Sequence, residues 1–214
     1  MRRKVAAEFF GTALLLLSVA GSGVMGESLA SGNAAVALLA NSLATGAALY
    51  VIISLLGPVS GAHLNPVVTL MSWAEGGCDM RQALAYAVAQ VSGAVAGVWA
   101  VHGMFGLRVL QLSAKSRATV GLWLSEVIAT ALLMLLIRTA SGRKDEKLPA
   151  YVALAVTAGY WATSSTFFAN PAATIARSLT DTFVGISPAD AGPFVLAQLV
   201  GLGFVLGVAR MLRR

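Results

Sequence analysis

The sequence predicts an all-α membrane protein with six transmembrane helices plus two re-entrant half-helices, arranged as inverted three-helix repeats. Three observations lead to this fold class. The chain is 57% hydrophobic and only 11% charged, a composition typical of membrane proteins. Apolar runs of about 20 residues, the length that crosses a bilayer, recur along it. Asn-Pro occurs twice inside apolar sequence, at Asn65-Pro66 and at Asn170-Pro171.

Length, charge and cysteine content narrow the possibilities. The 214 residues accommodate six spans with short connections, so we expect one domain covering residues 1–214. The net charge of +6 does not indicate nucleic-acid binding, because the basic residues stand at the ends of apolar runs. Cys78 is the only cysteine, which excludes an intramolecular disulfide and a Cys-rich metal site. No cofactor is expected.

Six apolar runs define the predicted spans. The first follows Arg2, Arg3 and Lys4 like a signal peptide, but Glu8 lies inside it, so we predict an uncleaved span. With six spans, eleven basic residues fall on the side of both termini and four on the other. The positive-inside rule then puts both termini in the cytoplasm. The predicted spans are residues 5–25, 34–56, 82–105, 119–138, 149–167 and 191–210.

The two Asn-Pro segments are predicted to start short helices within the membrane. Pro is tolerated at the first helical position, and the preceding Asn can cap free backbone N–H groups. Helix ends at membrane depth need partners, so these segments indicate a water-filled path. Two kinked structural helices are the alternative, which the duplication of the motif disfavours.

The two halves of the chain, about 1–110 and 111–214, share three landmarks in the same order. Equivalent residues are separated by 118, 105 and 108 positions. Three spans per half is an odd number, so the second half must be inverted in the membrane. The paired segments are 8–15 with 126–133, 65–70 with 170–175, and 89–93 with 197–201.

Inversion brings the N-termini of the two half-helices together near the midplane of the membrane. Each N-terminus carries about +0.5 of an elementary charge, so the pair disfavours cations there. The amide groups of Asn65 and Asn170 would replace the hydrogen bonds that a passing hydroxyl group loses.

These motifs resemble those of the aquaporin and aquaglyceroporin family of major intrinsic proteins, over essentially the whole chain. The resemblance implies a right-handed six-helix bundle with two half-helices, one pore per chain and a homotetramer in the cell's inner (plasma) membrane. It also implies a channel rather than an enzyme, with small neutral solutes and the lipid bilayer as partners. The matching segments are residues 7–12, 60–64, Asn65-Pro66-Val67 and Asn170-Pro171-Ala172.

The resemblance assigns roles to three further residues. Glu8 and Glu126 lie inside spans, where an unpartnered carboxylate costs several kcal/mol. The resemblance implies that they accept hydrogen bonds from the backbone of the re-entrant loops. A proton-coupled transporter that uses them as relays is the alternative. His63 is similar to the family's pore-lining histidine on the cytoplasmic side. Four glycines are expected to let helices approach closely. They are Gly93, Gly97, Gly201 and Gly207.

The sequence departs from the family pattern directly after the second Asn-Pro-Ala motif. Most members carry an arginine there, which closes a constriction near the outer mouth and helps repel cations and protons, whereas this chain has Ala173. Arg177 follows one helical turn later, about 6 Å closer to the outer surface. We expect Arg177 either to line the outer vestibule or to pair with Asp181.

Counting back from the motifs places the other constriction positions. Water-selective members usually have an aromatic residue, a histidine and the arginine around their constriction. Thr45, Ala158 or Gly159, and Ala173 are small and uncharged, and they predict a wide and uncharged selectivity filter. The counted positions are Thr45 in the second span, Ala158 or, if the register slips, Gly159 in the fifth, and Phe167 in the loop.

The predicted function is a passive channel for small uncharged solutes: water, glycerol-like polyols and arsenite-type metalloid hydroxides. Ala173 and the run Thr174–Phe183 also resemble a bacterial subgroup associated with arsenic detoxification. Two alternatives remain. One is a water-selective aquaporin in which Phe167 or Arg177 restores the constriction. The other is a secondary transporter driven by protons or sodium.

Overall fold

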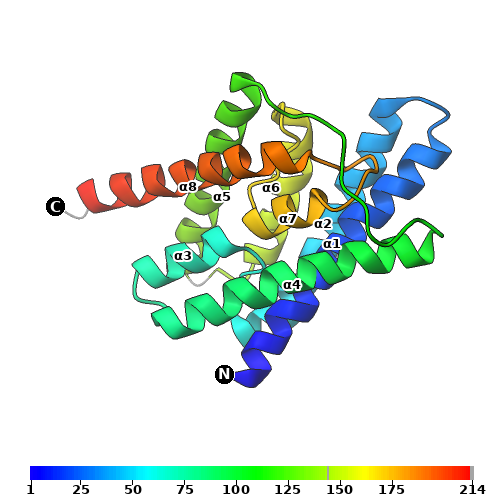
Figure 1. The fold of residues 1–214 in the computed structure, drawn as a ribbon. Coiled ribbons are helices and arrows are strands. Elements are labelled where there is room, and N and C mark those ends of the chain that lie inside the picture. The colour runs from blue at the N-terminus through cyan, green and yellow to red at the C-terminus, as the bar shows by residue number, and fades with distance from the viewer. Residues whose placement is uncertain (144, 213–214) are drawn as a thin grey trace.

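The computed structural model describes residues 1–143 and 145–212, and these form eight α-helices (Figure 1). The predicted all-α class is confirmed. Lys144, Arg213 and Arg214, three of the basic residues counted on the side of the termini, lie outside the described residues. The helices are α1 (Arg2–Leu29), α2 (Ala34–Ser60), α3 (Pro66–Ala74), α4 (Met80–Met104), α5 (Val120–Gly142), α6 (Leu148–Ala162), α7 (Pro171–Arg177) and α8 (Pro188–Met211).

Six helices correspond to the predicted spans, and α3 and α7 are the half-helices. Five helices of the described chain are long and apolar enough to cross a bilayer. The exception is α6, whose 15 residues extend only about 22 Å. It ends at Ala162 rather than at residue 167, because the following backbone N–H groups bond to side chains of α5. These donors are Ser165, Phe168 and Ala169.

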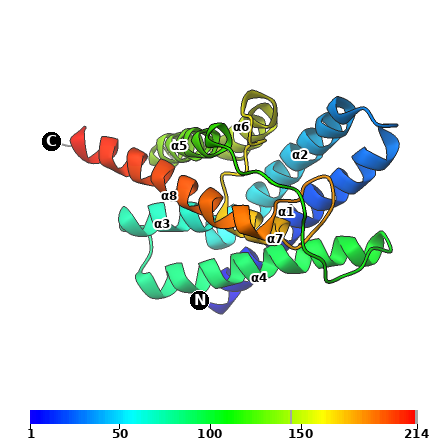
Figure 2. The same ribbon diagram turned by 45° about the horizontal axis from the view of Figure 1, so that its top comes forward.

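The half-helices α3 and α7 lie between α4 and α8, which are the third long helices of the two repeats (Figures 1 and 2). Both α3 and α7 contact α4 and α8. Around them, α1 packs against α2 and α4, and α5 packs against α6 and α8. The same neighbours therefore recur in the two halves, as an inverted repeat requires. Contacts between α2 and α6 join the halves on the other side.

Three of the four predicted glycines lie at close helix contacts. A Cβ at Gly93 or Gly97 would stand 2.2 Å from a backbone carbonyl oxygen of α1. A Cβ at Gly201 would stand 2.5 Å from a carbonyl oxygen of α5. The prediction is wrong for Gly207, which has no described neighbour within 4 Å because it lies on the exposed face of α8.

Candidate functional site

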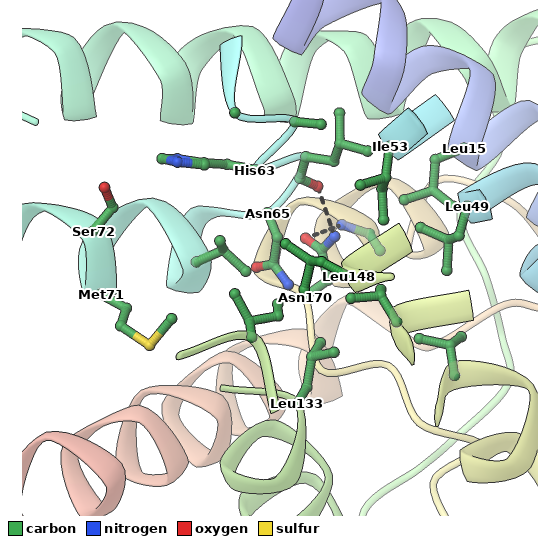
Figure 3. Close-up of a pocket in the computed structure, with 18 of the residues that line it drawn as sticks. Leu15, Leu49, Ile53, His63, Asn65, Met71, Ser72, Leu133, Leu148 and Asn170 are labelled. Carbon is green, nitrogen blue, oxygen red and sulfur yellow. Dashed lines mark hydrogen bonds between the residues drawn. The ribbon is translucent and has the colours of Figure 1, made fainter. Parts of the chain in front are cut away.

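A cavity of about 640 Å³ passes the N-termini of both half-helices. We call the end beside Gly142 and Leu148 the inner end, and the end beside Arg177 the outer end. The wall includes residues from α1, α2, α5 and α6 together with the loops that precede α3 and α7. Asn65 and Asn170 lie next to each other on this wall (Figure 3).

Each of these asparagines caps its own half-helix and bonds to the loop of the other. The Oδ1 atoms of Asn65 and Asn170 accept backbone N–H bonds of 3.0 Å from the first turn of their own helices. Asn65 Nδ2 donates to the carbonyl oxygen of Ala169 at 2.8 Å, and Asn170 Nδ2 donates to that of Leu64 at 2.9 Å. Because an amide group has two N–H donors, each side chain keeps one for a molecule in the cavity.

The other residues of the two motifs shape the half-helices without lining the cavity. Pro66 and Pro171 stand at the first helical positions, where a missing N–H leaves no hydrogen bond unmade. Val67 and Ala172 are fully buried beside them. In each motif the Asn therefore faces the cavity, and the next two residues fix the start of the helix.

Glu8 and Glu126 hold the two loops by the same pattern of bonds. Each carboxylate accepts backbone N–H groups from the two residues that precede Asn65 or Asn170. Both carboxylates are fully buried, so these bonds compensate the cost of placing them inside the bundle. The donors are His63 and Leu64 for Glu8, and Phe168 and Ala169 for Glu126, at 2.7–3.0 Å.

Both loops contain residues with positive φ that are not glycine. Leu64 and Ala169, directly before the asparagines, have φ of 53° and 46°. This left-handed conformation costs roughly 1–3 kcal/mol per residue. It turns their carbonyl oxygens toward the opposite asparagine, which donates to them. The glutamate bonds hold the strained backbone in place.

No role was predicted for two glutamines that complete this network. Gln90 Nε2 donates to Glu8 at 2.8 Å and to Thr69 at 3.0 Å. Gln198 Nε2 donates to Glu126 at 2.6 Å, and it also donates to the equivalent threonine of α7. Their sequence signal was the repeated Ala-Gln pair, which marked a repeat landmark but indicated no partner.

Equivalent positions in the two loops carry different rings. His63 lines the cavity, and its Nδ1 lies 3.1 Å from Thr69 Oγ1. The equivalent residue of the second loop is Phe168, which also lines the cavity. Each ring has an edge-to-face partner on the third long helix of its repeat. The pairs are His63 with Tyr86 at 5.3 Å and Phe168 with Phe194 at 5.2 Å between centroids.

The prediction that Ala158 or Gly159 of the fifth span lines the constriction is wrong. Ala158 is exposed, and it lines a lateral pocket between α5 and α6 together with Gly159. The α6 residues that line the cavity recur every fourth position and end at Tyr160. The count back from Asn170 gave the wrong residues of α6. The helix ends at Ala162, and Gly159 packs against the ring of Phe167.

Tyr160 changes the character of the predicted filter. Its hydroxyl oxygen lies 3.3 Å from Thr45 Oγ1, and both side chains line the cavity. Phe167 and Ala173 lie on the same wall. The last α6 residue in the cavity wall is therefore aromatic, where the sequence had predicted alanine or glycine.

The outer end of the cavity contains Arg177. Its side chain is only 4% exposed, and it lines the same cavity as Ala173. Arg177 Nε donates to the carbonyl oxygen of Val184 at 2.5 Å, and the guanidinium carbon lies 3.3 Å from the centre of the Phe168 ring. These contacts hold the positive charge in the cavity wall.

Pairing of Arg177 with Asp181, one of the two expected arrangements, is not found. The carboxylate of Asp181 instead accepts the backbone N–H of Ala114 at 3.0 Å. The α7 helix ends at Arg177, so the helical spacing that would have brought the two side chains together does not continue to Asp181.

Residues 1–166 match the model of the family described as "MIP: Major intrinsic protein". The chain belongs to the major intrinsic protein family. Another major intrinsic protein, aquaglyceroporin AqpS of Rhizobium meliloti (strain 1021), is 45% identical over 212 residues, which are 99% of this chain and 91% of that protein. Aquaporin AqpM of Methanothermobacter marburgensis is 30% identical over 170 residues, 70% of this chain and 68% of its own.

A solved major intrinsic protein has the same fold. The X-ray structure of the aquaglyceroporin from Plasmodium falciparum superposes with a TM-score of 0.76 at 22% sequence identity. The match covers 96% of this chain and 93% of that one. As a major intrinsic protein, this chain is a multi-pass membrane channel for small neutral solutes and not an enzyme.

Proposed function

We propose that this channel passes water, glycerol-like polyols and arsenite-type metalloid hydroxides down their gradients. The observation that carries this function is Ala173 in the cavity wall, directly after the second Asn-Pro-Ala motif. Neither its methyl group nor the hydroxyl of Thr45, which also lines the cavity, carries a charge. A relative that is 45% identical is named an aquaglyceroporin, which supports the polyol part.

The rest of the wall also suits hydroxylated solutes. Leu15, Leu49 and Ile53 form an aliphatic side of the cavity near Asn65 and Asn170 (Figure 3). A polyol can therefore exchange its bonds to water for amide N–H groups while its carbon atoms contact the aliphatic side. Arsenous acid, uncharged and rich in hydroxyl groups, presents the same hydrogen-bonding groups.

A water-selective aquaporin is the second candidate. Tyr160, Phe167 and Arg177 all line the cavity, and their large side chains favour a narrower path than the sequence predicted. In this case water would pass and glycerol would be excluded.

Replacing Ala173 with arginine distinguishes the two candidates. On the broad-solute function, we expect glycerol and arsenous acid flux to fall about tenfold or more, with a smaller loss of water flux. The longer side chain narrows the path for glycerol and arsenous acid more than for water, and its guanidinium adds a positive charge to a cavity-wall position that carries none. Stopped-flow light scattering of proteoliposomes measures the three fluxes.

Ala173→Gln is the matched control, since it adds similar bulk without charge. Wild-type vesicles that pass water but neither glycerol nor arsenous acid would refute the broad-solute function. An Ala173→Arg variant with unchanged fluxes would favour the water-selective candidate.

The proposed arrangement is a homotetramer in the inner (plasma) membrane with both termini in the cytoplasm. Eleven basic residues on the side of the termini against four on the other support this orientation. Cys78, the only cysteine, lies in the connection between α3 and α4 and is partly exposed. We expect a membrane-impermeant thiol reagent to label it in inverted vesicles and not in intact cells. The opposite labelling pattern would show that both termini lie outside the cytoplasm.

A further inference from the structure

Three charged side chains of the described residues line the cavity, and only two of them neutralise each other. At the inner end, Arg138 Nε lies 2.6 Å from Glu75 Oε1. At the outer end, Arg177 has no carboxylate of the described chain within ion-pairing distance. The two ends of the cavity therefore differ: one arginine is paired and the other is not.

The contacts of Arg177 leave part of its guanidinium free. The bond from Nε to Val184 is its one side-chain hydrogen bond within residues 1–143 and 145–212. The ring of Phe168 covers one face of the guanidinium at 3.3 Å. Both Nη groups are left as donors on a side chain that is 96% buried and lines the cavity.

The carboxylates around the outer end are engaged by backbone groups. Asp181 accepts the N–H of Ala114 at 3.0 Å, and Asp190 accepts the N–H of Arg117 at 2.7 Å. Glu126 accepts the loop N–H groups described above. None of these acids lines the cavity.

A second cation lies close to the same ring. The guanidinium carbon of Arg117 is 5.1 Å from the centre of Phe168, and its Nε donates to the carbonyl oxygen of Gly185 at 3.1 Å. Two guanidinium groups therefore approach one aromatic ring, and neither forms an ion pair with a carboxylate of the described residues. Such a concentration of positive charge attracts anions.

We propose that the outer end of the cavity binds a small oxyanion, a carboxylate or a phosphate, through the two Nη groups of Arg177. The planar guanidinium fork matches two oxygen atoms of such an anion. Phe168 and Val184 fix the plane of the fork, and Arg117 adds positive potential. Because Arg177 forms part of the cavity wall, the bound anion obstructs the path and inhibits the flux of neutral solutes.

Titration calorimetry with inorganic phosphate tests this site on the purified full-length protein in uncharged detergent, at constant ionic strength. We expect binding to wild type and at least about tenfold weaker binding to Arg177→Gln, since a charge-assisted bidentate contact is lost. Arg138→Gln, which removes the paired arginine of the same cavity, should bind phosphate like wild type. This readout requires no solute flux, so it is independent of the proposed solutes.

Arg177→Lys keeps the positive charge and loses the planar guanidinium fork. This variant replaces Arg177→Gln in the binding experiment if Arg177→Gln does not fold. Its phosphate affinity should fall several-fold. In proteoliposomes, phosphate should reduce the glycerol or water flux of wild type more than that of either variant, each compared with its own flux without phosphate. Absence of binding to wild type, or equal affinity in wild type and the Arg177 variants, would overturn the site.

Discussion

Replacing Glu8 with alanine is expected to destroy the channel. The carboxylate accepts hydrogen bonds from Ser60 Oγ, the backbone N–H groups of His63 and Leu64, and Gln90 Nε2, all between 2.6 and 3.0 Å. Each buried donor left without a partner costs about 1–3 kcal/mol, so the loss of stability should reach about 4 kcal/mol or more. This is a large share of a typical folding free energy of roughly 5–15 kcal/mol.

The loss would also release the strained loop before α3, where Leu64 holds a left-handed backbone. Asn65 would then lose its position in the cavity. Thermal unfolding in detergent and glycerol flux in proteoliposomes measure the two effects. Glu27→Ala is the matched control, because Glu27 is exposed and its contact with Lys115 is long, at 3.8 Å. A comparable loss in both variants, or normal flux in Glu8→Ala, would contradict the anchoring role.

Replacing Gly97 with valine should separate α1 from α4. A Cβ at this position would stand 2.2 Å from the carbonyl oxygen of Ala13 and 3.0 Å from the backbone nitrogen of Leu17. Backbone atoms of a packed helix cannot move aside as a flexible side chain can, so the helices must shift. We expect a loss of about 3 kcal/mol or more, at the upper end of overpacking effects, measured by thermal unfolding.

Because α1 also carries Glu8, the shift should reduce glycerol flux as well as stability. Gly103→Val on the same helix is the control, since no described atom lies within 4 Å of a Cβ there. That variant should unfold within about 1 kcal/mol of wild type. If the two valine variants were equally stable, the close approach of α1 and α4 would not depend on Gly97.

The half-helices could be predicted because their signal is local. Pro66 and Pro171 restrict the backbone at one position each, and an asparagine before each can cap the helix that follows. The spans followed from the length of the apolar runs. A carboxylate inside a span needs partners wherever it is found, so Glu8 and Glu126 stood out without any knowledge of the fold.

The register of α6 could not be predicted in the same way. Counting from Asn170 placed Ala158 or Gly159 at the cavity, but the position depends on where the helix ends. That end is set by Glu126 and Ser125 of α5, which hold the loop after Ala162. Because these contacts join residues 40 or more positions apart, the sequence near residue 160 contains no pattern that predicts where α6 ends.

The sequence by itself determined the class of molecule: an apolar chain of inverted repeats with two capped half-helices, whose acids inside the spans required hydrogen-bond partners. Only the tertiary structure decided which side chains share the cavity wall, such as Tyr160 with Thr45 and Arg177 with Phe168. The physical reason is the range of each interaction. Caps, prolines and hydropathy act within a few residues, whereas the wall of the cavity is built from segments that meet only after the helices pack.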